Sequence, residues 1–483
     1  MTAAAARAAT GRAATGRAAA AVRPSARQVA WQAMEFYGFV HFGMNTMTDR
    51  EWGEGHDDPA AFDPAGLDAD QWITVLKSAG MTGVILTCKH HDGFCLWPSD
   101  VTAYTVASSP WREGRGDVVA EVADAARRHG LKFGIYLSPW DRTEASYGSG
   151  TAYDDFYVAQ LTELLTRYGP VFSVWLDGAN GEGPNGKVQV YDWERYYAVV
   201  RESQPDAVIS VCGPDVRWCG NEAGDTRPDE WSVVPGALRE AERTAERSQQ
   251  ADDGVFARLV RSDDRDLGSR AALAGHEDDL VWYPAEVNTS IRPGWFHHPA
   301  EDAEVRSVDE LFGIYLNAVG GNSCFLLNVP PARDGLVRDA DVAVLEQLGR
   351  RVEEFRARRI EARATVSSGT PGDVATAWPG TGHQPWRPDD ADPLPALTLA
   401  FAGPRPVEAV VLGEDITHGQ RIEHVVVRGR REGSWTTLTE ANSVGHLRVL
   451  TFPPAVVDAV TVEVPQARDT PVVARAAVIG AAS

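Results

Sequence analysis

Two carboxylates occupy positions that suit chemistry better than packing. The apolar run VFSVWLD (171–177) ends on Asp177, and glycines and an amide follow at once. A second carboxylate, Glu222, lies between an amide and small residues in WCGNEAG (218–224). Asp before Gly is also a common turn starter, which is the structural alternative for Asp177. Two carboxylates across one pocket can transfer a glycosyl group to water, because one attacks the anomeric carbon and the other protonates the leaving oxygen.

The two roles require different protonation states. The acid must stay protonated near neutral pH, and burial together with the negative charge of Asp177 would favour this at Glu222. The attacking carboxylate must stay ionised through hydrogen bonds from its surroundings. Glu286, in YPAEVNTSIRPGWFHH (283–298), is the reserve candidate for the acid.

Four segments carry the polar and aromatic side chains that a pyranose ring needs. They are HFGMNTMTDREW (41–52), KHHDGFCLW (89–97), IYLSPWDR (135–142) and the segment 283–298. Sugar hydroxyls take directional hydrogen bonds, and the C–H face of the ring packs on a flat aromatic side chain. Each residue taken alone could instead be a packed structural residue. Glu286, Arg292 and Trp295 are candidates for ring contacts, and the other candidate substrate-site residues in these segments are His41, Glu51, Trp52, His90, His91, Tyr136 and Trp140.

The segment 89–97 and the preceding Cys88 also offer possible zinc ligands. The spacing matches no tetrahedral motif, and several of these side chains should alternate to opposite faces of a strand. We expect no metal or organic cofactor, because carboxylates supply both the proton transfer and the nucleophilic attack. The residues that a zinc site would draw on are Cys88, His90, His91, Asp92 and Cys95.

Short apolar runs alternate with amphipathic stretches and must position these residues. Helical apolar faces recur at 72–79, 118–126 and 158–165, and a glycine follows each of them. These glycines, Gly80, Gly130 and Gly169, are expected to adopt the left-handed conformation that ends a helix. The predicted strands, buried on both faces, are 36–43, 82–88, 132–138, 171–177, 207–213 and 323–329.

Repeated strand and helix units predict a (β/α)8 (TIM) barrel, whose catalytic groups lie at the C-terminal ends of the strands. A doubly wound sheet is the competing fold. Polar residues recur at many strand exits here, whereas a doubly wound sheet concentrates them at one switch point. The barrel is therefore favoured.

The chain divides into three predicted parts. Residues 1–28 form an Ala/Arg-rich, low-complexity tail that we expect to be disordered. The barrel is assigned to residues 29–358. Residues 359–483 lose helical periodicity and show short β-branched runs, which predict a β-sandwich. A charged stretch within 214–278 is expected to be an insertion over the barrel mouth, in part helical.

The composition argues against several classes of partner. The 46 basic and 68 acidic residues give a formal charge of −22, which opposes binding to phosphate backbones and anionic lipids. The five cysteines are odd in number and show no C-x-x-C spacing, which makes a disulfide framework unexpected. No signal peptide or membrane-spanning stretch is recognisable, and a cytoplasmic or non-classically exported protein is expected. The oligomeric state is not predicted.

Several of these motifs, in this order, resemble those of the α-L-fucosidases of glycoside hydrolase family 29. The resemblance covers about residues 30–355 and rests on HFG…EW, KHHDGF, YLSPW, WLDG and LLNVPP. It implies that Asp177 is the nucleophile of a retaining mechanism. It also implies contacts to the fucose ring from His41, Glu51, Trp52, His90, His91 and Tyr136, with Arg292 and Trp295 carried over as further contacts.

The motif WCGNEAG resembles the branch of this family restricted to α-1,3 and α-1,4 fucosyl linkages on branched sugars. In that branch the glutamate of the motif, here Glu222, is the general acid/base. Cys219 replaces the usual valine, an apolar exchange of similar size. The C-terminal segment, with VLGEDITHGQR (411–421), is similar to a β-sandwich often attached to this branch and related to discoidin-like carbohydrate-binding modules. Packing support for the barrel and independent sugar binding are both open for it.

The resemblance predicts a retaining exo-α-L-fucosidase that removes α-1,3/1,4-linked L-fucose from branched, Lewis-type oligosaccharides through a covalent fucosyl-aspartate. A fucosidase of broad linkage specificity is the nearest alternative. A catalytically silent sugar-binding protein would not need both Asp177 and Glu222. A metal-dependent hydrolase would use His90 and His91.

Overall fold

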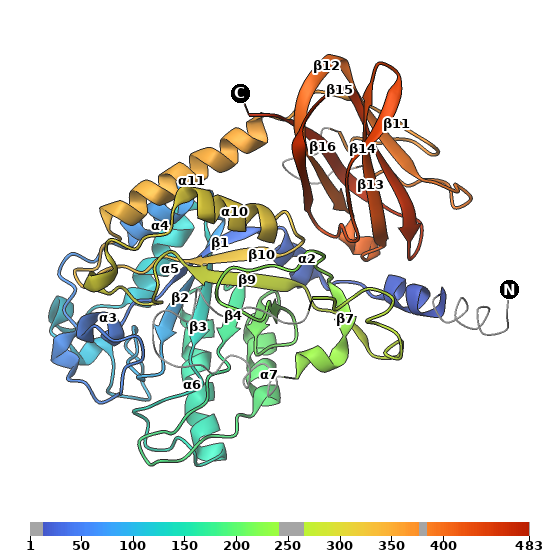
Figure 1. Ribbon diagram of the computed structural model, residues 1–483. Coiled ribbons are helices and arrows are strands. Elements are labelled where there is room, and N and C mark those ends of the chain that lie inside the picture. Colours follow the sequence, from blue (N-terminus) through green and yellow to red (C-terminus); the bar gives the residue numbers. More distant parts are fainter. Residues whose placement is uncertain (1–12, 241–264, 376–383, 483) are drawn as a thin grey trace.

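Eight parallel strands form a nearly closed barrel in the computed structural model, which describes residues 13–240, 265–375 and 384–482 (Figure 1). The strand order runs from β5 through β4, β3, β2, β1, β10 and β9 to β6, and a parallel bridge between Ser210 and Val216 links the two ends. The predicted barrel is confirmed, and the doubly wound alternative does not apply. The strands are β1 (Phe36–Val40), β2 (Gly83–Lys89), β3 (Lys132–Leu137), β4 (Ser173–Leu176), β5 (Val208–Val211), β6 (Arg217–Trp218), β9 (Ala285–Ser290) and β10 (Cys324–Asn328).

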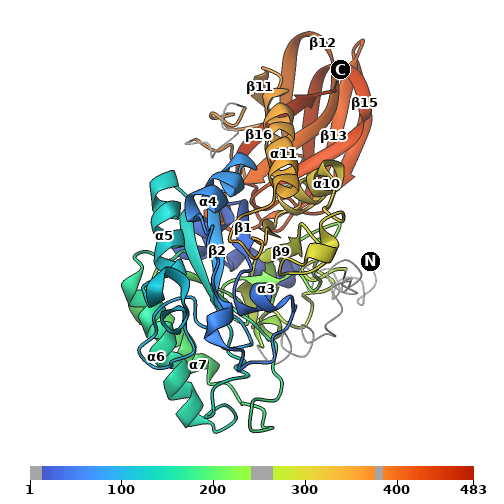
Figure 2. The same cartoon turned by 90° about the vertical axis from the view of Figure 1, so that its left-hand side faces the viewer.

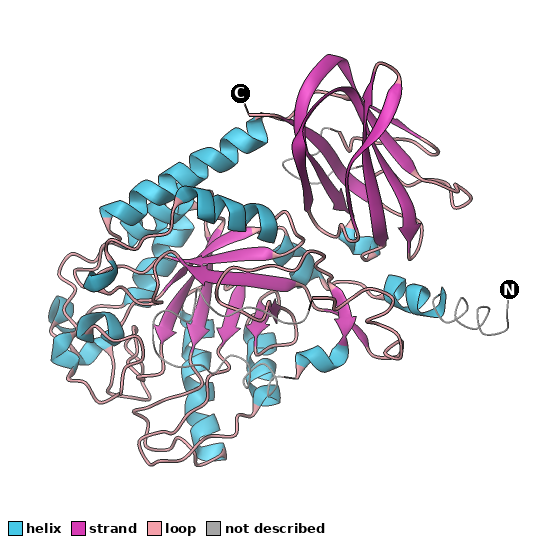
Figure 3. Cartoon of the chain, in the orientation of Figure 1, coloured by secondary structure: helices cyan, strands magenta, loops and turns pink. Residues whose placement is uncertain are grey.

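Amphipathic helices lie outside these strands (Figure 3). α4 packs between α5 and α11, and α6 packs on α7. The three predicted helix-ending glycines have φ values of +86° (Gly80), +76° (Gly130) and +84° (Gly169), which confirms their left-handed conformation. Within the described ranges, no helix is both long and apolar enough to span a membrane. The helices are α3 (Met44–Thr48), α4 (Ala69–Ser78), α5 (Val118–His129), α6 (Thr151–Arg167), α7 (Trp193–Ser203), α10 (Val308–Ala318) and α11 (Asp339–Ala357).

The N-terminal segment differs from the prediction of a disordered tail over residues 1–28. Residues 13–21 are helical, and α2 (Ala26–Gln32) follows with a capping box between Ser25 and Gln28. Helices form here because alanine has the highest helix propensity and because a capping box fixes the start of α2. The low-complexity composition had indicated disorder instead. The first twelve residues lie outside the described part.

The N-terminal helix packs at the junction between the barrel and the C-terminal part of the chain. Ala19 is fully buried in a small apolar cluster with Trp282 and Ile416. Trp282 belongs to a two-stranded antiparallel sheet of β7 (Val233–Pro235) and β8 (Leu280–Trp282). The predicted helix in the charged insertion falls largely on residues 241–264, outside the described residues.

An antiparallel sheet domain follows the barrel, as predicted, and Figures 1 and 2 show it beside α10 and α11. The strand order is β11–β12–β15–β13–β14, and β16 pairs with β12. Register shifts in β12 mark bulges, which bend a long strand. The strands are β11 (Arg363–Val366), β12 (Ala396–Glu414), β13 (Ile422–Arg431), β14 (Ser434–Ala441), β15 (Arg448–Ala467) and β16 (Val473–Gly480).

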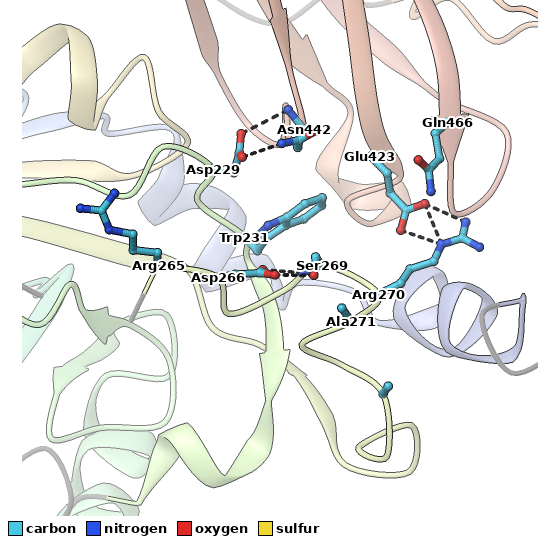
Figure 4. Close-up of a pocket in the computed structure, with 11 residues that line it drawn as sticks. Asp229, Trp231, Arg265, Asp266, Ser269, Arg270, Ala271, Glu423, Asn442 and Gln466 are labelled. Carbon is cyan, nitrogen blue, oxygen red and sulfur yellow. Dashed lines mark hydrogen bonds and ion pairs between the residues drawn. The ribbon is translucent and has the colours of Figure 1, made fainter. Parts of the chain in front are cut away.

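Polar contacts fasten this sheet domain to the barrel loops around a cavity of about 520 Å³ (Figure 4). Asp229 accepts hydrogen bonds from the backbone and side-chain nitrogens of Asn442, at 3.2 and 2.9 Å. Arg270 pairs with the buried Glu423 at 2.7 Å. Arg468, which also bonds Glu423, lies over the ring of Trp231 at 4.5 Å. These contacts tie together segments that are about 200 residues apart in the sequence.

A second junction gathers charge around Glu35, next to β1. Its carboxylate pairs with Arg475 of β16 and Arg356 of α11, at 3.3 and 3.4 Å, and with His446 at 3.3 Å. Burial would raise the pKa of Glu35, but the hydrogen bond and charge of His446 and the two arginines lower it to about 2. A depressed carboxyl pKa contributes stability above the unfolded-state value, and this stability is lost as the pH falls towards the folded-state value.

We expect Glu35→Gln to destabilise the fold at pH 7 by about 3 kcal/mol, because the amide removes the negative charge with which Arg475, Arg356 and His446 interact. The difference in unfolding temperature between wild type and variant should shrink as the pH is lowered from about 4.5 towards 2, where the wild-type carboxylate is itself protonated. Thermal unfolding of both proteins across this pH range measures the difference. Glu432→Gln, an exposed position, is the control. A difference that does not depend on pH would contradict the linkage.

Candidate active site

The strand exits of the barrel bring most of the predicted residues together. His41 follows β1, His90 and His91 follow β2, and Asp177 follows β4. Tyr136 lies on β3. The remaining predicted residues of the cluster come from the loops that follow strands: Glu51, Trp52, Trp140, Glu222 and Trp295. Parallel strands end at one face of a barrel, so residues far apart in sequence meet there.

Asp177 is held by two hydrogen-bond donors from the protein. The Tyr136 hydroxyl donates to Asp177 Oδ2 at 2.8 Å, and the backbone N–H of Ala179 donates to Oδ1 at 2.8 Å. Burial and the charge of Asp177 raise the pKa of Tyr136 well above its usual value, so the phenol keeps its proton and remains a donor. The two bonds fix the orientation of the Asp177 carboxyl group.

Glu222 lies in the opposite electrostatic situation. Burial raises its pKa to about 8; the hydrogen bond from Trp295 opposes this, and the charges of Asp177 and Glu51 add to it. The Trp295 indole N–H donates to Glu222 Oε2 at 3.2 Å. Glu222 is therefore largely protonated at neutral pH. Of the two carboxyl groups, it is the one suited to give up a proton.

Three neighbouring histidines of the cluster are neutral at pH 7. Burial lowers the pKa of His41 to about 3 and that of His91 to about 4, and it places the pKa of His90 well below its usual value. The His41 and His90 rings lie 5.8 Å apart, and the His90 and His91 rings 4.0 Å apart. At neutral pH each ring therefore has one N–H donor and one acceptor nitrogen.

The hydrogen-bond network assigns the tautomers. Asn328 uses its amide N–H groups on Ser290 and Trp295, so its oxygen accepts the Nδ1–H of His41 at 2.8 Å. The Ser138 hydroxyl donates to the Trp140 carbonyl and accepts the Nδ1–H of His91 at 2.7 Å. Nε2 of both rings is left as an acceptor.

His90 has the other tautomer. Its Nδ1 accepts from the Asn45 side-chain amide at 3.1 Å, so its Nε2 carries the hydrogen. His91 Nε2 lies 3.8 Å from Asp177 Oδ2. The three rings thus combine acceptors and a donor, as hydroxyl recognition requires.

Three tryptophan rings pack against the histidines. The ring centroids of Trp295 and His41 are 5.1 Å apart, and those of Trp140 and His91 are 5.0 Å apart. Trp52 packs edge-on to both Trp140 and His91, at 5.7 Å in each case. An indole has a flat apolar face, and the use of these three faces for binding a sugar ring stays a prediction.

Glu51 is tied to the loop that carries Trp295. Its carboxylate accepts the backbone N–H groups of Trp295 and Phe296, the latter at 3.1 Å, and contacts His298 at 3.0 Å. The hydrogen bonds that the His298 ring donates to Glu51 and Asp49 raise the pKa of His298 to about 9, against the effect of burial. The imidazolium and Glu51 form an ion pair that holds the Trp295 loop in place.

Two predicted ring contacts do not join this cluster. Arg292 is fully buried and pairs with Asp341 of α11 at 3.0 Å and with Asp302 at 2.9 Å. Glu286 of β9 is also fully buried, and both of its oxygens are bonded by protein donors, Tyr37 and Trp175. Residue type and motif position predict both contacts, but neither separates the interior of a barrel from its mouth.

Four further residues of the cluster lie within the predicted segments, although the sequence does not predict them as site residues: Asn45, Ser138, Phe296 and His298. The Phe296 ring packs edge-on to His41 and His90, at 5.3 and 4.9 Å. Their positions within the same four segments were the available signal. Across residues 13–240, 265–375 and 384–482, no three His, Cys, Asp or Glu side chains are grouped to hold a metal ion.

Comparisons with known proteins point to one family. The family profile described as alpha-L-fucosidase matches residues 25–355. "Alpha-L-fucosidase 1" of Arabidopsis thaliana is 39% identical over 439 residues, which cover 89% of this chain and 81% of the plant protein. Two solved structures also match. A glycoside hydrolase 29 family member from a rumen bacterium is 34% identical, with a TM-score of 0.77 over 96% of this chain and 78% of that chain. A Ruminococcus gnavus GH29 fucosidase in complex with fucose is 27% identical, with a TM-score of 0.81 over 96% and 95%.

Proposed function

The chain belongs to the α-L-fucosidase family, glycoside hydrolase family 29, and from this premise we propose a retaining exo-fucosidase in which Asp177 is the nucleophile and Glu222 the general acid/base. The observation that carries the proposal is the contrast between the two carboxyl groups. Asp177 accepts hydrogen bonds from Tyr136 and from the backbone N–H of Ala179, whereas burial raises the pKa of Glu222 to about 8. Retaining hydrolysis needs this division of roles.

In the first step, an Asp177 oxygen attacks the anomeric carbon of the terminal α-L-fucosyl unit. The bond to the leaving oxygen breaks, and that oxygen takes the proton of Glu222. The product is a β-fucosyl ester of Asp177 and a free aglycone. Tyr136 keeps its proton throughout and orients the attacking carboxylate through its 2.8 Å hydrogen bond.

In the second step, Glu222 is ionised and takes a proton from water. The water oxygen attacks the anomeric carbon and the bond to Asp177 breaks, which releases α-L-fucose and restores both carboxyl groups. Two inversions give net retention. Proton NMR of the first-formed anomer during hydrolysis of an aryl α-L-fucoside tests this, and β-L-fucose as the first product would contradict it.

The ring contacts follow from the hydrogen-bond inventory of the cluster. His41 and His91 offer Nε2 acceptors, and His90 offers an Nε2–H donor, to the fucose hydroxyls. Trp52, Trp140 and Trp295 supply aromatic faces for the C–H groups and the 6-methyl group. Glu286 has both carboxylate oxygens bonded by protein donors, and Arg292 is fully buried in ion pairs with Asp341 and Asp302, so we assign no sugar contact to either residue.

For the linkage, we propose preference for α-1,3 and α-1,4 fucosyl bonds on branched, Lewis-type glycans. Support comes from the WCGNEAG motif around Glu222, which resembles the branch with this restriction. We expect kcat/KM for a Lewis-type trisaccharide to exceed that for a 2′-fucosylated trisaccharide by at least about a hundredfold, because a misplaced aglycone loses oriented proton transfer from Glu222. Fucose release from the two sugars at equal enzyme concentration measures the ratio. Equal rates would favour the broad-specificity alternative.

The C-terminal sheet domain is proposed to support the barrel and not to bind sugar independently. Its contacts through Glu423, Asn442 and His446 join it to barrel loops and to Glu35. A metal-dependent mechanism through His90 and His91 would show itself by loss of activity with a chelator and recovery with zinc.

A further inference from the structure

Glu286 is a buried carboxyl group that the proposed mechanism does not use. It is fully buried inside the barrel, and its two oxygens accept the indole N–H of Trp175, at 2.8 Å, and the hydroxyl of Tyr37. Burial raises its pKa to about 7, while these two hydrogen bonds oppose the shift. A fully buried carboxyl group costs stability compared with an apolar side chain of the same size. Buried carboxyl groups with a raised pKa are frequent at functional sites.

The neighbours of Glu286 lead directly to the nucleophile. Trp175 on β4 is paired in register with Tyr136 on β3, and their rings are stacked at 5.4 Å with an interplanar angle of 30°. Tyr136 in turn donates the 2.8 Å hydrogen bond to Asp177. Trp175 is also only two residues before Asp177, which directly follows the last residue of β4.

We propose that Glu286 is a positioning residue for the nucleophile: it holds the Trp175 indole, which supports Tyr136, which orients Asp177. This inference rests on the proposed role of Asp177. It differs from the earlier expectation that Glu286 binds sugar or acts as a reserve acid, because both of its oxygens face protein donors.

The donor inventory explains why this residue is a carboxylate. Tyr37 accepts the indole N–H of Trp31 at 3.0 Å, so its own hydrogen is directed at Glu286. Trp175 can only donate. Both partners of Glu286 are therefore donors, and a carboxylate accepts from both. A glutamine would accept from one and turn its own N–H₂ group against the other, which displaces either Tyr37 or Trp175.

The experiment combines Glu286→Gln with Trp175→Phe, which removes the indole N–H but keeps a ring against Tyr136. With an aryl α-L-fucoside, each single variant is expected to lower kcat by about tenfold to a hundredfold, since a small misplacement of a reacting group costs this much. KM should change little. The double variant should be no slower than the slower single variant, because both substitutions break the same contact.

A variant that lacks the Asp177 carboxylate distinguishes loss of nucleophile positioning from general damage to the fold or to the site. In Asp177→Gly with azide supplied as the external nucleophile, Glu286→Gln and Trp175→Phe should cause no further loss of rate. Glu414→Gln is the matched control: Glu414 is an equally buried glutamate in the sheet domain with its pKa also raised to about 7 by burial. It should lower the unfolding temperature and leave kcat unchanged.

Three results would overturn the proposal: an unchanged kcat in Glu286→Gln, additive losses in the double variant, or an equal loss in the azide-rescued background. If Glu286→Gln does not fold, Trp175→Phe in the two backgrounds decides alone. A failure of azide to rescue Asp177→Gly itself would instead count against the proposed nucleophile, and the two failures are thus distinguishable.

Discussion

Replacing Asp177 by glycine is expected to lower turnover of an aryl α-L-fucoside by about four orders of magnitude or more, because the covalent step loses its nucleophile while the acid remains. The glycine leaves an opening beside the anomeric carbon. Azide that enters it should attack from the face that Asp177 occupied and restore part of the rate. The expected product is β-fucosyl azide, the result of a single inversion.

Product analysis by NMR, with and without azide, measures this outcome. Asp229→Gly is a suitable control, since Asp229 bonds Asn442 at the junction of the two domains and stands apart from the catalytic cluster. It should retain wild-type turnover and form no azide adduct. Wild-type activity in Asp177→Gly would end the assignment of the nucleophile, as would rescue that gives only the α-azide.

The exit of β4 could be predicted because its chemistry interrupts an otherwise apolar run. Four consecutive buried residues, Ser173–Leu176, precede a carboxylate and glycines, and a parallel strand buried on both faces has this appearance. The same logic located His41 and His90. Several such exits in one chain then indicated a barrel, whose geometry brings them to one face.

The seventh strand of the barrel could not be predicted in the same way. β9 has the sequence AEVNTS and is buried at every position, although four of its six residues are polar. These side chains pair inside the barrel: Glu286 with Trp175, Asn288 with Trp218 at 3.0 Å, and Ser290 with Asn328 at 2.9 Å. Hydrophobic periodicity cannot reveal a buried strand whose polar side chains form hydrogen bonds with residues of other strands.

The same limitation explains the placement of Arg292. A guanidinium just after a strand resembles a sugar contact in sequence, and only the distant Asp341 of α11 shows that the charge is neutralised within the fold. Long-range polar pairs of this kind leave no local signal. Sequence therefore identified the residue types of the site better than it separated the mouth of the barrel from its interior.

Removing the side chain of Glu222 is expected to separate substrates by their leaving groups. In Glu222→Ala, an aryl fucoside with a good leaving group needs little protonation, so the first step should stay comparatively fast and the fucosyl-Asp177 intermediate should accumulate as a burst. A natural oligosaccharide needs the proton, and its kcat/KM should fall by about 10³-fold to 10⁴-fold. Rapid-quench kinetics on both substrates measures the contrast, and Glu408→Ala, in the sheet domain, is the control. Equal losses would point to another acid.

The pH profile gives an independent reading of the same residue. Burial, with the charges of Asp177 and Glu51, raises the pKa of Glu222 to about 8, so its protonated form predominates below that pH and is lost above it. Wild-type kcat/KM for the oligosaccharide should therefore decline as the pH rises through about 8, and this descending limb should be absent in Glu222→Ala.

In Glu222→Ala, azide should trap the accumulated fucosyl-Asp177 intermediate as α-fucosyl azide, the product of two inversions, whereas Asp177→Gly gives the β-anomer. Opposite azide anomers from the two variants require a covalent intermediate on one carboxylate and acid/base action by the other. Finding the same anomer in both would contradict the retaining mechanism.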